Sequence, residues 1–107
     1  MVYKKVDNNQ KAIVGELEKL GCSAVSLASV GKGCPDLAVA LMNKTWLIEV
    51  KNEDHYWKLE PAQIKFYSGW KAEVPILESV EDARAFVTAV RSDTYNEWVR
   101  GKLVSLF

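Results

Sequence analysis

Two apolar runs joined by only two polar residues restrict the fold of this chain more than any other feature of its sequence. The first run spans residues 36–42, the second spans residues 45–51, and Asn43-Lys44 lies between them. Short apolar runs bounded by turn residues are typical of β-strands, and so short a link makes the two strands pair antiparallel. The sequence therefore predicts a β-hairpin that turns at Asn43-Lys44.

The register of this hairpin decides which polar side chains meet. With the turn placed in this way, Asp36 lies opposite Lys51, and Ala38 lies opposite Glu49. Because strand side chains alternate between the two faces of a sheet, all four share one face. Asp36 and Glu49 are then diagonal neighbours, roughly 7–8 Å apart. Asn-Lys is a poorer type I′ turn than Asn-Gly, and a slip of one residue would place Asp36 and Lys51 on opposite faces.

Asp36, Glu49 and Lys51 form a combination suited to phosphodiester chemistry. Two neighbouring carboxylates repel each other unless a cation lies between them, and a hard cation such as Mg²⁺ prefers oxygen ligands. A cation held in this way polarises a phosphodiester, while a lysine beside it orients the attacking water or stabilises the developing negative charge. The simpler alternative is that Glu49 and Lys51 form the solvated face of an amphipathic strand. Their joint placement with Asp36 favours the catalytic interpretation.

The rest of the chain predicts helices and strands around this hairpin. Apolar residues recur at helical spacing in residues 7–20, and a second helix over residues 60–71 opens with a proline. Ser79 is a suitable cap for a third helix. Further strands are predicted at residues 22–28 and 74–77. The elements follow in the order α-β-β-β-α-β-α, which predicts an α/β fold with a mixed central sheet flanked by helices.

Several aromatic and apolar residues lie outside this scheme. The segment after residue 92 ends in an apolar tail, which predicts an edge strand or a contact between subunits. Trp70 and Trp98 are interpreted as core or subunit contacts. The polar loop after the hairpin contains His55, Tyr56 and Trp57. A single histidine in such a loop is seldom a base or ligand, and core burial competes with base stacking as the role of the two aromatic residues.

Composition limits where the protein works and with what. The 107 residues, 49% of them hydrophobic, suit one compact domain over residues 1–107. Lysine plus arginine and aspartate plus glutamate both number 14, so any DNA-binding surface must be local. Cys22 and Cys34 lack CxxC spacing and predict free thiols in a cytoplasmic protein. The apolar stretches predict neither export nor membrane insertion.

Two stretches resemble the signature of PD-(D/E)XK nucleases: Gly33-Cys34-Pro35-Asp36-Leu37 and Glu49-Val50-Lys51. Two further stretches make the chain resemble the VRR-NUC family of that superfamily over residues 7–85: Gln10-Lys11-Ala12-Ile13 and Leu59-Glu60-Pro61-Ala62-Gln63. Cys34 departs from the family pattern, in which an aliphatic residue usually precedes Pro-Asp, and its thiol is expected to pack as a small hydrophobe.

The resemblance implies a restriction-endonuclease-like core and a nuclease that uses Mg²⁺ or Mn²⁺. Carried over position by position, it assigns Asp36, Glu49 and the Val50 carbonyl as metal ligands. It assigns Lys51 as the catalytic lysine, and Gln10 and Gln63 as supporting site residues. Free-standing members of the family resemble junction resolvases and act as homodimers. The resemblance therefore implies a structure-specific DNA endonuclease for branched DNA such as four-way junctions. The alternative is a non-catalytic nucleic-acid-binding or assembly module that keeps the fold, which the zero net charge favours.

Four polar residues near this constellation have plainer interpretations as well. Gln10 falls on the core-facing stripe of the first helix, where an amide side chain suggests a functional role. It is equally well explained as an ordinary polar residue of the first turn. Gln63 is equally a solvated helix residue. Glu16 lies on the flank of the stripe and is left outside the site. Lys32, in a glycine-rich loop, is a candidate phosphate contact or part of a mobile connector.

Overall fold

A computed structural model describes residues 8–52 and 58–103 of the chain. The predicted order of helices and strands is confirmed, and one further helix follows it. Along the chain the elements are α1 (Asn8–Lys19), β1 (Ser23–Ser26), β2 (Leu37–Leu41), β3 (Lys44–Val50), α2 (Pro61–Gly69), β4 (Ile76–Leu77), α3 (Val80–Arg91) and α4 (Tyr95–Arg100).

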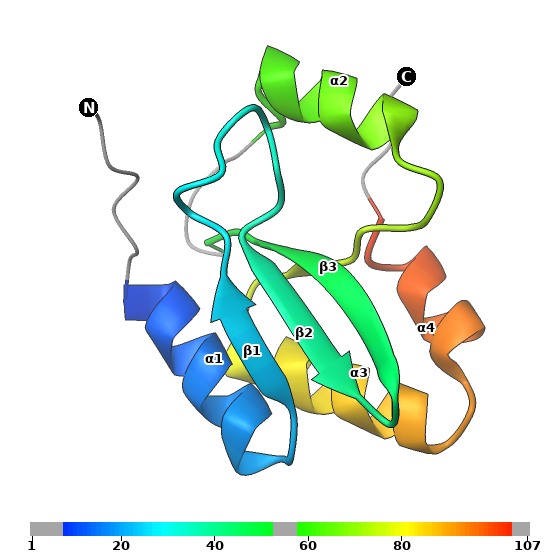
Figure 1. The fold of residues 1–107 in the computed structure, drawn as a ribbon. Helices are drawn as coiled ribbons and strands as arrows, with labels where there is room; N and C mark the ends of the chain where they lie inside the picture. The colour runs from blue at the N-terminus through cyan, green and yellow to red at the C-terminus, as the bar shows by residue number, and fades with distance from the viewer. Residues whose placement is uncertain (1–7, 53–57, 104–107) are drawn as a thin grey trace.

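One mixed sheet contains the four strands in the order β1-β2-β3-β4. β1 and β2 pair antiparallel, as do β2 and β3, whereas β4 lies parallel to β3. A parallel pair needs a long connection, and here α2 lies within it. The fold is therefore the predicted α/β arrangement of a mixed sheet flanked by helices (Figure 1).

The turn between β2 and β3 differs from the prediction. Leu41 pairs with Lys44, so the turn is formed by Met42 and Asn43 and not by Asn43-Lys44. Both turn residues have positive φ, 53° for Met42 and 66° for Asn43. Two successive positive φ values are typical of a type I′ turn, whose twist matches that of the flanking strands. The turn geometry is thus the expected one, centred one residue earlier in the chain.

This change corrects the predicted register. Leu37 pairs with Ile48, so the next residue outward, Asp36, stands opposite Glu49. The predicted pairing of Asp36 with Lys51, and the diagonal relation of Asp36 to Glu49, are therefore wrong. The register differs from the predicted one by two residues, an even number, so the alternation between faces is unchanged.

The core lies between the sheet and two helices. α1 and α3 lie side by side against one face of the sheet (Figure 1). Ile13 and Leu17 of α1 meet Val39, Ile48 and Phe86 there, and all five side chains are fully buried. The opposite face of β1, β2 and β3 faces the viewer in Figure 1, and no described helix crosses it.

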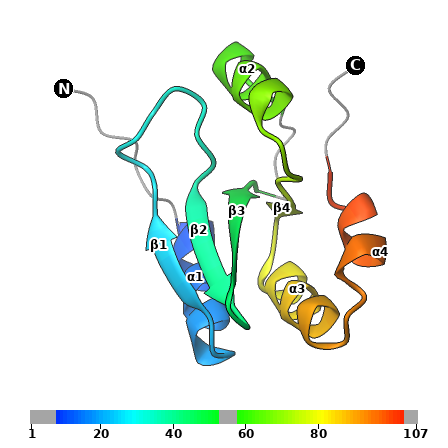
Figure 2. The ribbon, with the colours of Figure 1, turned by 45° about the vertical axis from the view of Figure 1, so that its right-hand side comes forward.

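Helix α2 lies apart from this layered core, beyond the ends of β2 and β3 (Figure 2). The loop between β1 and β2 reaches up to it. At the point of contact Gly33 has a φ of +77°, and a Cβ added there would lie 2.1 Å from the Ala62 carbonyl oxygen. Only glycine allows the two backbones to come so close. The loop that precedes Asp36 is thereby docked on the first turn of α2.

The C-terminal part of the described chain differs from the expected edge strand. Residues 95–100 form α4, and Trp98 packs against the core beside Phe86, with ring centroids 5.7 Å apart. After α4, the Lys102 carbonyl accepts a hydrogen bond of 2.9 Å from the Ile76 amide. The last four residues of the tail lie outside the described residues. Among the described helices, none has the length and apolar character needed to cross a membrane.

Candidate active site

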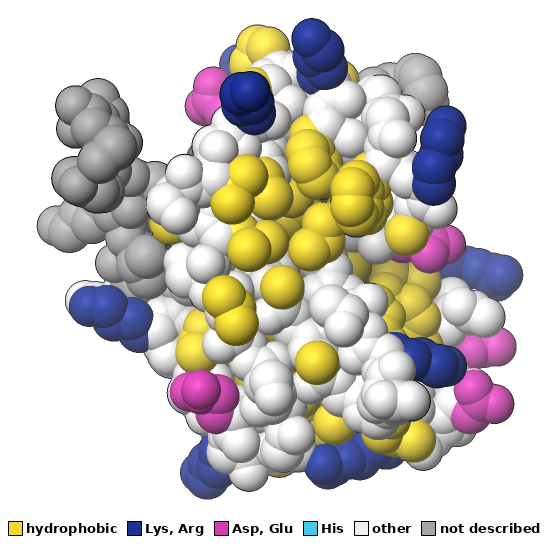
Figure 3. Space-filling model, viewed as in Figure 1, with side chains coloured by type: hydrophobic (Ala, Val, Ile, Leu, Met, Phe, Trp, Pro, Cys, Tyr) yellow, Lys and Arg dark blue, Asp and Glu magenta, His cyan; other side chains and the backbone are white. Residues whose placement is uncertain are grey.

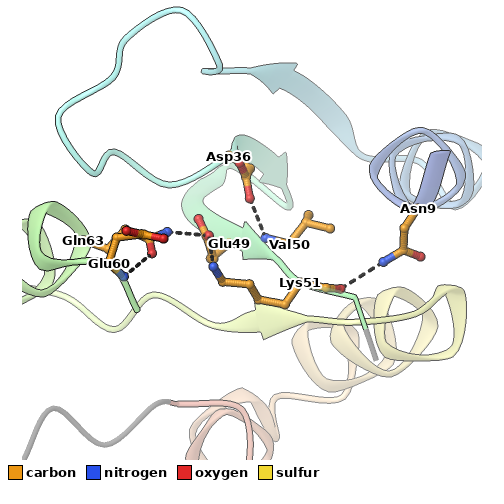
Figure 4. Close-up of polar contacts among 7 residues, drawn as sticks. All are labelled: Asn9, Asp36, Glu49, Val50, Lys51, Glu60 and Gln63. Atoms are coloured by element: carbon orange, nitrogen blue, oxygen red, sulfur yellow. Dashed lines mark hydrogen bonds and ion pairs between the residues drawn. The ribbon is translucent and has the colours of Figure 1, made fainter. Parts of the chain in front are cut away.

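Asp36 is fixed at the entrance to β2 by the backbone of β3. Its Oδ2 accepts a hydrogen bond of 2.9 Å from the Val50 amide, and the Asp36 carbonyl accepts one of 2.8 Å from the Leu27 amide. The residue is only 5% exposed. An interior carboxylate held by a backbone amide has a defined orientation, and here it points toward the end of β3 (Figure 4).

Glu49 is the most deeply buried ionisable residue of the site, with 1% of its surface exposed. Its Oε2 accepts a hydrogen bond of 2.7 Å from Gln63 Nε2 and lies 3.3 Å from Lys51 Nζ. Figure 4 shows the three side chains converging from β3 and α2. Removing a carboxylate from water is costly, and the amide donor together with the ammonium group offsets part of that cost.

One open cavity of about 490 Å³ collects the predicted site residues. Its lining includes both carboxylates, Lys51 and Gln63, together with Gln10 from α1. Gln10 and Gln63 are buried, with 6% and 7% of their surfaces exposed. The burial of Gln63 contradicts its plainer interpretation as a solvated helix residue, and Gln10 lies buried on the core-facing side of α1. The cavity also reaches Val50 and the glycine-rich loop.

Gln63 links the start of α2 to the site. While its amide nitrogen donates to Glu49, its Oε1 accepts a hydrogen bond of 2.9 Å from the Glu60 amide. The second contact closes a capping box at the N-terminus of α2, where Pro61 occupies the first helical position. One side chain thus fixes both the beginning of the helix and the orientation of a buried carboxylate.

Two neighbours of the site were not foreseen from the sequence. Asn9 Nδ2 donates to the Lys51 carbonyl at 2.9 Å and to the Glu78 carbonyl at 3.1 Å, and so fastens the end of β3 to the end of β4. Tyr67 lies one helical turn after Gln63 on α2. Burial and the neighbouring charges of Glu49 and Asp36 raise the pKa of the Tyr67 hydroxyl above its ordinary value. Its spacing from Gln63 is the only signal of this in the sequence.

The donor set suits a hard divalent cation. Two buried carboxylates stand opposite each other at the cavity, and Val50, the residue after Glu49, lines the cavity as well. Among residues 8–52 and 58–103, no group of three or more His, Cys, Asp and Glu side chains is arranged to hold a metal ion. Mg²⁺ commonly binds through one or two carboxylates and keeps several waters, so the donor set fits Mg²⁺ better than Zn²⁺.

Other candidates lie outside the cluster or outside the described chain. Glu16 pairs with Arg84 at 2.8 Å on the protein surface, in agreement with its exclusion from the site. Cys34 is a half-buried cysteine at the cavity wall, and Lys32 is exposed on the same loop. The suggestions for His55 and its aromatic neighbours in residues 53–57 fall outside the described residues.

Comparison with known proteins found a similar solved structure. No family model matches the sequence, and no curated protein matches it. A solved structure described as "VRR_NUC domain" is similar to this chain, with 27% sequence identity and a TM-score of 0.57. The similarity covers 74% of this chain and 89% of that structure. The likeness therefore extends over most of both chains.

Proposed function

The chain belongs to the VRR-NUC family of nuclease domains, and on that premise we propose that it is a DNA endonuclease dependent on Mg²⁺ or Mn²⁺. The observation that carries the proposal is the pair of facing buried carboxylates, Asp36 and Glu49, with Lys51 Nζ 3.3 Å from Glu49. A purely structural site has little reason to bury two acids beside one lysine, because desolvating unmatched charge destabilises the fold. A bound cation supplies the missing positive charge.

In this proposal the side chains divide the work. Asp36, Glu49 and the Val50 carbonyl would hold the cation, which supplies electrostatic polarisation of the phosphodiester. Lys51, whose side chain is 17% exposed, reaches the cavity from the next position and stabilises negative charge on the phosphate or orients the attacking water. Gln63 holds Glu49 in place, and Gln10 of α1 also lines the cavity.

We further propose branched DNA, such as a four-way junction, as the substrate of a homodimer. A dimer presents two sites related by a two-fold axis, which suits a substrate with paired strands of opposite direction. The 14 basic and 14 acidic residues of the chain argue against a broad cationic surface, so contacts must concentrate near the cavity. The competing proposal is a binding or assembly module without catalysis.

Cleavage assays decide between the two proposals. Labelled duplex, flap and four-way-junction DNA should be incubated with the protein and Mg²⁺, Mn²⁺ or EDTA. We expect cutting only with metal, and loss of at least about 100-fold in rate for Asp36→Ala and for Lys51→Ala, because one removes a proposed metal ligand and the other a proposed charge-stabilising group. Glu16→Ala is the matched control, since it removes an acid outside the cavity. DNA binding without metal-dependent cutting would favour the non-catalytic module.

A further inference from the structure

Helix α2 carries two sets of side chains with different surroundings. Gln63 lines the cavity and donates to Glu49, and Tyr67, four residues later, is close enough to Glu49 and Asp36 for their charges to act on its hydroxyl. Phe66 and Trp70, also four residues apart, form a stacked pair with ring centroids 5.2 Å apart and planes inclined by 20°. Trp70 is 45% exposed, so of its two predicted roles, core residue or subunit contact, the first is wrong. α2 therefore carries Gln63 at the site and an aromatic row, half-buried Phe66 and exposed Trp70, outside the cavity.

The aromatic row is continuous with the site. Tyr67 lies beside the Glu49 carboxylate, and its ring is 6.2 Å from the Phe66 ring. Phe66 in turn stacks on Trp70. The rings thus lead outward from the proposed catalytic carboxylate to the surface in two steps. Trp70 lies seven residues after Gln63, about 10 Å along the helix axis, which is within reach of a strand bound at the cavity.

The exposure of Trp70 contrasts with that of the described tryptophans in the core. Trp46 and Trp98 pack against Phe86, with centroid distances of 5.2 Å and 5.7 Å. In the described part of the chain, the one ring contact of Trp70 is its stack on Phe66. Ile64, on the same helix, is 40% exposed. Figure 3 shows hydrophobic side chains gathered below α2. Exposed apolar side chains gathered on one face commonly mark a binding site.

The charge around this row favours a polyanion over an apolar protein partner. Residues 61–71 contain Lys65 and Lys71 but no aspartate or glutamate, in a chain that is neutral as a whole. Both lysines are exposed. Figure 3 shows Lys or Arg side chains along the outer border of the region around α2. Flat aromatic rings between lysines are the arrangement that binds bases and phosphates of single-stranded nucleic acid.

We propose that Phe66 and Trp70 stack on an unpaired base of the DNA strand that enters the cavity, while Lys65 and Lys71 contact the adjacent phosphates. The substrate class that fits is DNA with an unpaired nucleotide close to the cleaved bond, as at a flap, an overhang or an opened branch point. Fully paired DNA keeps its bases inside the duplex, so it does not present a free base to the rings. This inference rests on the proposed nuclease function, from which it takes the position of the scissile phosphodiester.

Metal-free binding measurements test the inference separately from catalysis. Fluorescence anisotropy in EDTA should compare three labelled DNAs: a blunt duplex, the same duplex with a flap, and a single strand. We expect the wild-type protein to prefer the flap and the single strand. Trp70→Ala should weaken binding to these two by roughly 5- to 100-fold, the effect of losing one base–aromatic stack, and leave duplex binding nearly unchanged. Trp70→Phe should retain most of the preference because it keeps an aromatic face.

The matched control is Val25→Ala, which trims an apolar side chain that is 61% exposed on β1, away from α2. Replacing both Lys65 and Lys71 with alanine should weaken binding to all three DNAs. The slope of the logarithm of the binding constant against the logarithm of the salt concentration should fall in magnitude by about one per lysine. Wild-type affinity of Trp70→Ala for the flap, failure of the wild type to bind DNA, or a change of Trp70→Ala from dimer to monomer in sedimentation would each overturn the inference. Cleavage with Mg²⁺ is scored independently. A Trp70-dependent preference without cutting would defeat the nuclease proposal alone, and cutting without that preference would defeat this inference alone.

Discussion

At the scale of single residues, Gln63 combines a structural and a proposed catalytic task. Its side chain closes the capping box with the Glu60 amide and donates to the buried Glu49 carboxylate at 2.7 Å. A hydrogen bond to a charged group contributes about 1.5–3 kcal/mol, whereas a helix cap contributes about 1 kcal/mol. The contact with Glu49 is therefore expected to account for most of the stability that Gln63 contributes.

We expect Gln63→Ala to lower the free energy of unfolding by about 2–4 kcal/mol and to reduce DNA cleavage at least about tenfold, because Glu49 loses its amide donor. Urea denaturation and the cleavage assay measure the two effects. Glu60→Ala is the matched control, since it removes the other half of the capping box and leaves the Gln63–Glu49 contact in place. Equal losses of activity in the two variants would mean that Gln63 acts only through the helix.

The sequence could predict which residues gather at the cavity better than it could predict which of them contact one another. Asp36, Glu49 and Lys51 were identified because strand alternation places them on one face, and a register shift of two residues leaves that face unchanged. Asn9 was missed because its acceptors, the carbonyls of Lys51 and Glu78, lie 42 and 69 residues away in the chain. Nothing in local sequence reports a bond between a first-turn amide and two distant strand ends.

At the scale of elements, the approach of the β1–β2 loop to α2 depends on one glycine. Gly33 has a positive φ, and an added Cβ would lie 2.1 Å from the Ala62 carbonyl oxygen and 2.7 Å from the Gln63 nitrogen. Neither neighbour can yield, because both are backbone atoms of the first turn of α2. The loop and the helix must then separate, and Asp36 and Gln63 stand on the two sides of that contact.

Gly33→Ala should therefore destabilise the protein by about 2–4 kcal/mol, the sum of left-handed backbone strain and overpacking, and should impair cleavage. Gly31→Ala is a close control. Gly31 has a φ of +71° but no atom within 4 Å of an added Cβ, so it should show only the backbone strain, about 1–2 kcal/mol. Urea denaturation of the two variants measures the difference. Equal stabilities would show that the close approach to α2 carries no energy.

The sequence predicts a two-residue hairpin turn, but the predicted turn lies one residue too late in the chain. Met42 is 59% exposed and has no preference for positive φ, so nothing in its chemistry marks it as a turn residue. Pairing of the apolar residues of β2 and β3 places it there against its local preference. Asn43, which does favour positive φ, was correctly included in the turn.

Changing Met42 to Asn together with Asn43 to Gly should stabilise the protein by about 1 kcal/mol, since Asn-Gly is the preferred type I′ sequence and relieves the strain at Met42. Thermal and urea denaturation measure the change. Lys44→Gly is the control, because Lys44 is the first residue of β3 and glycine there should destabilise. A less stable Asn-Gly variant would contradict the turn at Met42-Asn43.

At the scale of the whole molecule, the proposed site lies where a rigid layer meets a separate helix. The sheet, α1 and α3 share the core, whereas α2 stands beyond the strand ends (Figure 2). Asp36, Glu49 and Lys51 belong to the first part, and Gln63 and the aromatic row belong to the second. The composition, with equal numbers of acidic and basic residues, could predict that a nucleic-acid surface is local but not which element carries it. That depends on which side of α2 faces solvent.

The stability of the whole molecule should fall in alkaline solution. Tyr95 packs among Trp46, Phe86 and Trp98, and its buried hydroxyl has no hydrogen-bond partner among the described residues. Burial, and to a lesser extent the charge of Glu73, raise the pKa of Tyr95 from 10.0 to about 12. The folded protein therefore holds this proton more tightly than the unfolded chain. The contribution of this group to stability is complete below pH 10 and is lost as the pH rises through about 12.

Tyr95→Phe tests this expectation because phenylalanine keeps the ring and has no proton to lose. At neutral pH the variant should be as stable as the wild type or more stable by about 1 kcal/mol, since a buried hydroxyl without a partner is removed. Between pH 10 and 12 it should lose less stability than the wild type, by on the order of 2–3 kcal/mol at the upper end. Urea denaturation followed by tryptophan fluorescence, repeated from pH 7 to 12, measures both. Parallel pH curves for the two proteins would place the alkaline transition elsewhere, with Tyr67 the next residue to replace because its pKa is raised as well.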